Sequence, residues 1–288
     1  MFKSAIRPAL LLMFAAATAP AAAAPAMWEV RDSDSAIWLF GSFHVLPPDL
    51  QWRTKLFDDT LAAADKVVFE ADVRPSAMAS IGAEAFLRGI YTDGTLLTDV
   101  IDDRTEGKLR AIASELSLPV GSLLAMKPWF AALTVSSGAT ASIGYTAEGV
   151  EYVLQPELAA ERQIYLESGK EQLDVLSAAP EDEQLAMFEA TLDEIDGMAK
   201  VLDKMTSSWS QGTPEKLGDL FLSQTGMYGD AFLERLIYAR NRNWMPSLEN
   251  MLAENTEAMV IVGAGHLIGE NSVIDLLEKS GYEIERIQ

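Results

Sequence analysis

The sequence predicts an α/β protein with a central, mostly parallel sheet, flanking helices and a helical insertion. Three observations support this fold class. Four short apolar segments lack the alternation of half-exposed strands, which is typical of strands covered on both faces. Segments with helical character lie between them and are long enough for the crossovers that parallel strands require. The chain has 288 residues, 49% of them hydrophobic, which is enough for a large core.

The predicted buried strands are rich in β-branched and aromatic residues. They are Ala36–Phe40, Lys66–Phe69, Gln163–Leu166 and Ala258–Val262. A fifth segment, Tyr282–Ile287, alternates apolar and polar residues, which predicts a strand at the edge of the sheet.

The remaining periodic segments predict helices. Their starts and stops are marked by proline, acidic first turns and Ser-Gly pairs. The expected helices are Leu56–Ala64, several between Pro75 and about Ile143, one starting at Pro180, Ala231–Leu252 with a bend near Pro246, and Ser272–Lys279. We therefore expect one α/β domain over residues 24–288, with helical insertions around 75–145 and 180–255.

The N-terminus has the layout of a secretory signal peptide. Lys3 and Arg7 precede an apolar stretch over residues 8–18 and an alanine run. The stretch is shorter than the roughly 20 residues of a spanning helix, so we expect cleavage near Ala23. This predicts a signal peptide over residues 1–23 and a periplasmic or secreted protein. An uncleaved membrane anchor is the alternative.

Composition excludes several classes of partner. The chain carries a net charge of −21, and loss of Lys3 and Arg7 makes it −23. Such a field disfavours nucleic acids and anionic lipid surfaces. No later segment is apolar enough to predict stable membrane insertion after signal cleavage. The absence of cysteine excludes disulfides and thiolate metal sites. No pattern indicates an oligomeric state.

The two histidines of the expected mature chain occur in the same pattern, Gly41-Ser42-Phe43-His44 and Gly263-Ala264-Gly265-His266. Each follows a predicted strand. Glu70 and Glu167 end the other two buried strands. If the four strands are parallel, these imidazoles and carboxylates meet at one edge of the sheet, where open α/β sheets bind ligands. We expect the glycines to let the backbone turn sharply there.

These residue types suit a divalent metal such as Mn, Co or Zn, with His44, Glu70, His266 and Glu167 as candidate ligands. A bound ion would acidify a water molecule or polarise a carbonyl. Without a metal, a glutamate–histidine pair could act as a general base. Histidines with purely structural roles remain a third interpretation. Arg240, on a predicted helix, is a candidate partner for a site glutamate or a substrate carboxylate.

At these residues the chain resembles the TraB/GumN family, which includes the pheromone-shutdown proteins and the animal Tiki proteases. The matching segments are GSFH, VVFE, MKPW, GVEYVLQPELAAERQIYLES, ARNRNW and VGAGHLIGENSVIDLLEKSGYEIERI. The resemblance implies an EreA/ChaN-like fold, and for Tiki proteins a metal-dependent protease activity that favours manganese or cobalt. It also implies a catalytic core of His44, Glu70 and His266, with Arg240 beside it. Phe43 departs from the β-branched residue that many members carry.

The prediction for function is an exported metal-dependent hydrolase, a peptidase by resemblance, that acts on a peptide or small-molecule substrate. The alternatives are a metal-free His/Glu hydrolase of the esterase type and a non-catalytic protein that binds a peptide or haem. Metal content separates the first two, and binding without turnover identifies the third.

Overall fold

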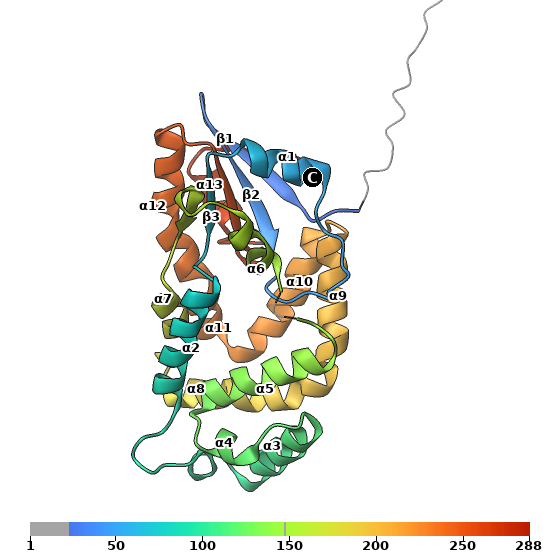
Figure 1. Cartoon of the computed structure of the whole chain (residues 1–288), viewed down its shortest axis with the longest axis vertical. Coiled ribbons are helices and arrows are strands. Elements are labelled where there is room, and N and C mark those ends of the chain that lie inside the picture. Colours follow the sequence, from blue (N-terminus) through green and yellow to red (C-terminus); the bar gives the residue numbers. More distant parts are fainter. Residues whose placement is uncertain (1–22, 147) are drawn as a thin grey trace, which may run out of the picture.

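The computed structural model describes residues 23–146 and 148–288. The predicted signal peptide lies outside the described residues, apart from residue 23. Among the described residues, no helix combines the length and the apolar character needed to cross a bilayer. A six-stranded sheet forms one end of the molecule, and a group of helices forms the other (Figure 1).

The sheet confirms the predicted α/β class. Its strands are β1 (Met27–Arg31), β2 (Ala36–Ser42), β3 (Lys66–Phe69), β4 (Gln163–Tyr165), β5 (Ala258–Gly263) and β6 (Glu283–Arg286). Their order is β4-β3-β5-β2-β1-β6, and the first four are parallel to one another. The strand β6 lies at an edge, as its alternating sequence predicts. The strand β1, which runs antiparallel to both β2 and β6, was not predicted.

Side chains of the parallel strands alternate between two cores. In β5, Met259 and Ile261 pack in the core that contains Phe57 of α1 and Trp209 of α9. Val260 lies in the opposite core, with residues of α12 and α13. Helices therefore cover both faces of the sheet, which explains why the parallel strands are apolar throughout and show no alternating pattern in the sequence.

The helices account for most of the remaining chain. They are α1 (Lys55–Ala63), α2 (Pro75–Gly89), α3 (Asp103–Glu115), α4 (Val120–Leu124), α5 (Pro128–Ser142), α6 (Val150–Leu154), α7 (Gly169–Ser177), α8 (Glu181–Glu194), α9 (Met198–Ser210), α10 (Pro214–Thr225), α11 (Asp230–Leu233), α12 (Ala239–Ala253) and α13 (Val273–Lys279). Shorter helical turns are η1 (Leu97–Asp99), η2 (Gln155–Glu157), η3 (Ala160–Arg162), η4 (Ile195–Gly197), η5 (Gly226–Tyr228), η6 (Glu234–Tyr238) and η7 (Ala264–Leu267).

Residues between α2 and α9 form a separate helical core below the sheet (Figure 1). Phe188 and Leu192 of α8 pack there against Ala131 and Val135 of α5. The long helix expected after Pro180 is interrupted at η4, where Gly197 weakens helical propensity. The irregularity expected near Pro246 occurs earlier, because η6 is a π-helix and α12 continues through the proline.

Candidate active site

Four predicted site residues lie at the carboxyl edge of the sheet. His44 follows β2, Glu70 follows β3, Glu167 follows β4, and His266 lies in η7 after β5. Because β4, β3, β5 and β2 are consecutive and parallel, the ends of these strands meet at one edge. Arg240 reaches the same edge from α12. The structure therefore brings all five predicted residues together.

Gly263 marks the point where three of these side chains converge. A Cβ atom at this position would lie 3.1 Å from Glu70 Oε1, 3.5 Å from His44 Nε2 and 3.6 Å from His266 Cδ2. The backbone φ at Gly263 is −50°, which any residue can adopt. The expectation that glycine serves a sharp turn here was wrong. A Cβ atom here would be tight against the Glu70 carboxylate and in ordinary contact with both imidazoles, so all three groups lie around the backbone of Gly263.

Glu70 is a buried carboxylate with several donors. Its Oε1 accepts a hydrogen bond from the Gly263 N–H at 2.6 Å, and its Oε2 accepts one from Arg240 Nη2 at 2.5 Å. Gln172 of α7 donates to Oε2 at 3.3 Å. Burial alone would raise the pKa of Glu70. Its interactions with His266, Arg240, His44 and the Gly263 N–H outweigh burial and lower the pKa to about 2. Glu70 is thus an anion at neutral pH.

His266 is buried and held in one orientation. Its Nδ1 lies 2.6 Å from Asn241 Oδ1, and Asn241 Nδ2 donates to the Asn271 carbonyl at 2.8 Å. The amide oxygen must therefore accept, which places the imidazole proton on Nδ1. The lone pair of Nε2 faces Arg240 Nη1 at 3.0 Å. The indole of Trp244 lies 4.4 Å away, centroid to centroid.

Burial lowers the pKa of His266 to about 3, and Arg240 lowers it further while Glu70 opposes the shift. The ring is therefore neutral near pH 7. Because His266 is neutral there, the charge that keeps Glu70 ionised at that pH is chiefly that of Arg240. The result is a neutral nitrogen donor and a carboxylate, with Nε2 3.6 Å from Glu70 Oε1.

His44 has the opposite environment. Its side chain is 64% exposed, and its Nδ1 lies 3.2 Å from Oε1 of Glu151, a buried carboxylate. The hydroxyl of Ser42 donates to the same oxygen. Attraction to Glu151 raises the pKa of His44 to about 9, although loss of hydration around the ring acts in the other direction. The other ring nitrogen, Nε2, faces Gly263.

Gly149 explains how Glu151 reaches His44. A Cβ atom on Gly149 would lie 2.4 Å from the carbonyl carbon of His44. Without one, the start of α6 packs directly on the backbone after β2, and the Val150 N–H donates to the Phe43 carbonyl at 3.0 Å. The first turn of α6 then presents Glu151 to the imidazole.

Arg240 joins the two glutamates of the edge. Its Nε lies 3.0 Å from Glu167 Oε2, and its Nη2 contacts both Glu167 and Glu70. Burial acts to lower the pKa of Arg240, but the two carboxylates raise it above its usual value. Arg240 Nη1 also donates to the Leu236 carbonyl at 2.8 Å, within the π-helix η6. Such π-helical turns occur frequently at functional sites.

A cavity of about 280 Å³ opens beside these residues. Its polar floor contains His44, Glu70, Arg240 and His266. Apolar side chains of α9, α10 and η6 form the walls, together with the segment after β2. The apolar lining residues are Phe43, Val45, Leu202, Met205, Leu217, Phe221, Leu236, Ile237 and Ala264. A mostly apolar pocket with a few convergent polar groups is typical of ligand sites.

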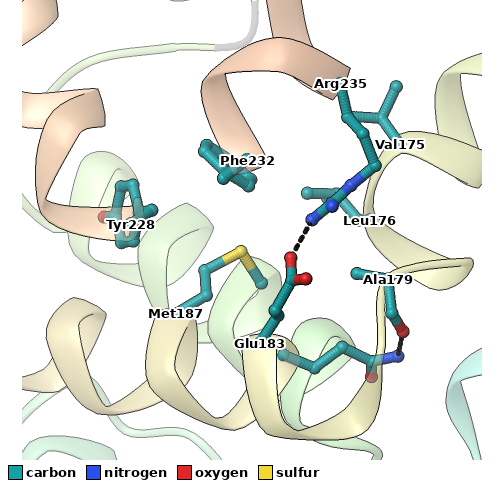
Figure 2. A pocket seen from close by; sticks show the side chains of 9 residues that line it. Val175, Leu176, Ala179, Glu183, Met187, Tyr228, Phe232 and Arg235 are labelled. Carbon is teal, nitrogen blue, oxygen red and sulfur yellow. Dashed lines mark hydrogen bonds and ion pairs between the residues drawn. The ribbon is translucent and has the colours of Figure 1, made fainter. Parts of the chain in front are cut away.

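A smaller pocket lies between α7, α8 and the segment from η5 to η6 (Figure 2). Its volume is about 10 Å³, which is the space of roughly one water molecule. Figure 2 shows Arg235 and Glu183 paired across it, at 2.6 Å. Its size and this ion pair indicate a gap in side-chain packing and leave the larger cavity as the candidate site.

Sequence reasoning missed the residues that orient the histidines. Glu151 and Asn241 each hold one Nδ1 atom, and Gln172 contacts Glu70. Glu151 and Asn241 have detectable signals: the first follows a glycine in the GVEYV segment, and the second is next to Arg240. Gln172 carries no signal of this kind, because only the packing of α7 beside β3 places it there.

The donor set is compatible with a divalent metal in chemistry, although its present geometry is not that of a metal site. Among residues 23–146 and 148–288, no three His, Cys, Asp or Glu side chains form a group that could hold an ion. Arg240 contacts both Glu70 and His266. However, each imidazole has its Nδ1 tied to an acceptor, as is usual for metal-ligating histidines. His44 Nε2 faces Gly263, and His266 Nε2 lies 3.6 Å from Glu70 Oε1.

Comparison with known proteins finds partial relatives and a family for the whole chain. Over 77 residues the chain is 30% identical to a protein of Amphimedon queenslandica named metalloprotease TIKI homolog, covering 26% of this chain and 14% of that protein. Over 56 residues it is 41% identical to metalloprotease TIKI2 of Xenopus tropicalis, covering 19% and 11%. The matches thus span less than a sixth of these relatives' lengths. No solved structure gives a significant match.

The model of the TraB/PrgY/gumN family matches residues 26–286. Since that match spans nearly the whole chain, the protein belongs to the TraB/PrgY/gumN family.

Proposed function

We propose that this protein is an exported, metal-dependent hydrolase that cleaves peptides, with His44, Glu70 and His266 as its catalytic core. One observation carries the proposal. His44 Nε2, Glu70 Oε1 and the ring of His266 all lie within 3.6 Å of the position that a Cβ of Gly263 would occupy. Three residues that follow three different strands thus meet around one backbone position, beside an apolar cavity.

His44, Glu70 and His266 would hold a divalent metal such as Mn, Co or Zn. A metal of this kind acidifies bound water and polarises a carbonyl. His266 offers the lone pair of Nε2, because its Nδ1 proton is committed to Asn241. Glu70 is charged at neutral pH, because its pKa is lowered to about 2. A carboxylate of such low pKa is a weak base, which favours a ligand role for Glu70.

Arg240 would keep Glu70 and Glu167 in place and supply positive charge near a substrate carbonyl. Its guanidinium contacts both carboxylates, so it has an ordered position without substrate. Arg240 Nη1 also contacts His266 Nε2, the nitrogen that would hold the metal. Nε and Nη2 of Arg240 contact Glu167, so the guanidinium has a carboxylate partner besides His266.

The peptide substrate is inferred from the relatives, which are named metalloproteases. Export is inferred from the signal-peptide pattern of residues 1–23. The alternative with direct support is a metal-free hydrolase. The contact of Arg240 with Glu70 and His266 favours it, because a fixed cation there can stabilise negative charge on a reacting carbonyl.

The test is to purify the protein without a histidine tag, measure its metal content, and assay cleavage of a mixed peptide pool. We expect cleavage with Mn²⁺, Co²⁺ or Zn²⁺, loss of cleavage in chelator, and recovery when metal is restored. Cleavage that persists in chelator would support the metal-free alternative. Tight peptide or haem binding without any turnover would contradict both enzymatic assignments.

A further inference from the structure

We propose that the apolar wall of the cavity is a subsite for one large apolar side chain of a peptide substrate, next to the bond that is cleaved. This inference rests on the proposed function, because it specifies the substrate class of the same site. The wall is formed by Leu202 and Met205 of α9, Leu217 and Phe221 of α10, and Leu236 and Ile237 of η6.

The wall is physically continuous with the reactive floor. A Cβ atom on Gly265 would lie 2.8 Å from Cζ of Phe221, so the phenyl ring packs end-on against the residue before His266. In the motif Gly263-Ala264-Gly265-His266, each of the two glycines therefore has a different group packed closely against it. Gly263 accommodates the polar cluster, and Gly265 accommodates the aromatic wall. An apolar group on Phe221 would place the adjoining backbone beside His266.

The size of the cavity suits a single side chain. Its volume of about 280 Å³ lies just below the roughly 300–1,000 Å³ range of small-molecule pockets. Leu202, Met205, Phe221 and Leu236 are only partly buried in the free protein. A ligand side chain between them would remove apolar surface from water, which is the main favourable contribution to such binding.

The charges around the cavity disfavour other side chains. The wall contributes no charged residue, and Arg240 of the floor is already paired with Glu70 and Glu167. An acidic or basic side chain placed against this wall would lose its hydration and find no charged partner on the wall, which is costly. The net charge of −21 adds a long-range repulsion against acidic peptides. Leucine, methionine and phenylalanine remain as the favoured side chains.

The experiment compares two sets of fluorogenic peptides that differ at one residue, on either side of the cleaved bond. Each set carries Phe, Leu, Ala or Asp at the varied position. In one of the two sets, we expect kcat/KM for Phe or Leu to exceed that for Ala by at least about ten-fold, because changes of this kind in an apolar pocket are worth about 10–200-fold. Asp should be cleaved more slowly than Ala.

Two variants change the space in opposite directions. Leu202→Trp fills the cavity and should reduce the preference for Phe over Ala by at least about ten-fold, while cleavage of the Ala peptide persists. Phe221→Ala enlarges the cavity and should weaken selection against the largest side chains. Leu222→Trp is the matched control, since Leu222 is exposed on α10 and does not line this cavity. It should leave the preference unchanged.

A binding measurement separates failure of the subsite from failure of the proposed function. N-acetyl-phenylalaninamide and N-acetyl-alaninamide are titrated into each protein by calorimetry. If no peptide is cleaved, yet the phenylalanine amide binds wild type at least ten-fold more tightly than Leu202→Trp, the subsite stands and the proposed peptidase activity fails. Equal cleavage of the Phe, Ala and Asp peptides, or a preference that Leu202→Trp leaves unchanged, would overturn the subsite.

Discussion

His44 and His266 follow the same sequence pattern but occupy contrasting environments. His266 is buried against Trp244, bonded to Asn241 and neutral, with a pKa lowered by burial to about 3. His44 is largely exposed and pairs with Glu151, whose charge raises its pKa to about 9. One imidazole is therefore a fixed, uncharged donor. The other lines the same cavity as a protonated, exposed group until a metal or a substrate competes for its nitrogen.

The contrast has its origin in the helices that cover each strand end. Helix α12 supplies Asn241, Trp244 and Arg240 to His266. The five-residue helix α6 supplies only Glu151 to His44. The shared pattern of a strand followed by a glycine and a histidine therefore places both histidines at the carboxyl edge of the sheet. The segment that packs on that edge sets the charge of the histidine.

The largest effect is expected at Glu70, which faces both histidines. Glu70→Gln keeps the shape of the side chain and removes its charge. We expect hydrolysis to fall by at least ~10²-fold, because a lost ligand weakens the hold on the ion that would activate water and loss of a catalytic group typically costs ~10²–10⁴. Glu157→Gln is the control, because Glu157 is an exposed partner of Arg53. Wild-type turnover in Glu70→Gln would remove Glu70 from the catalytic core.

The next effect is expected at Arg240, whose charge is shared by Glu70 and Glu167. Arg240→Leu leaves Glu70 and Glu167 buried without their shared partner, and breaking such a pair costs about 3–5 kcal/mol of folding free energy. Arg242→Leu, two residues along α12, removes only an exposed pair with Glu234, worth about 0–1 kcal/mol. Urea unfolding of both variants tests the difference. Similar losses in the two would contradict the structural role of Arg240.

The residues that orient the histidines should have smaller effects. Glu151→Ala frees His44, and Asn241→Ala frees His266. Each should lower metal affinity by ~10–100-fold, as is typical for groups that hold a metal-ligating histidine. Calorimetric titration with Mn²⁺ measures this, and Glu151→Gln, which retains an acceptor oxygen, should recover part of the loss. Unchanged metal affinity in both alanine variants would show that neither residue positions a ligand.

The effects of pH on stability should have opposite signs for the two histidines. The ordinary histidine pKa is 6.5. For His266, folding disfavours the proton, so stability falls as pH drops from 6.5 towards 3. For His44, folding favours the proton, so its contribution is present below pH 6.5 and is lost as pH rises through about 9. Exposure of His44 to solvent reduces the second effect.

Melting temperatures in chelator across pH 3–10 measure both contributions. His266→Gln should reduce the acid-side loss, and His44→Gln should reduce the alkaline-side loss. Below about pH 4.5, protonation of Glu70 in the unfolded state adds to the acid-side loss, because its pKa is lowered to about 2 in the folded protein. Identical pH profiles for the two variants would contradict the contrast between the environments.

Much of the fold was predictable because buried parallel strands leave a clear pattern. Segments such as Ala258–Val262 are apolar, short and rich in β-branched residues, and β5 extends over Ala258–Gly263. The strand β1 was missed because Glu29 and Arg31 interrupt a segment of five residues. The break at η4 was missed because amphipathic periodicity continues through it, although Gly197 marks the place.

For the site, the sequence predicted which residues converge, because strand ends of a parallel sheet share one edge. It did not predict how they interact. The pairing of Arg240 with both glutamates depends on the course of η6 and α12. The roles of Glu151 and Asn241 depend on how α6 and α12 pack on the ends of two strands. In the sequence, Gly149 and the position of Asn241 next to Arg240 are the signs of this packing.

The central claim is that His44 and His266 serve one metal site despite their different environments. The most direct test is a double-mutant cycle of melting temperatures for His44→Ala, His266→Ala and the double variant, with and without Mn²⁺, Co²⁺ or Zn²⁺. A ligand that binds only the folded state stabilises it by about 2.7 kcal/mol at 100 times Kd. We predict that wild type gains this increment and that either single variant loses all of it, so that the double variant loses no more. Separate, additive losses that are the same in metal and in chelator would contradict the shared site.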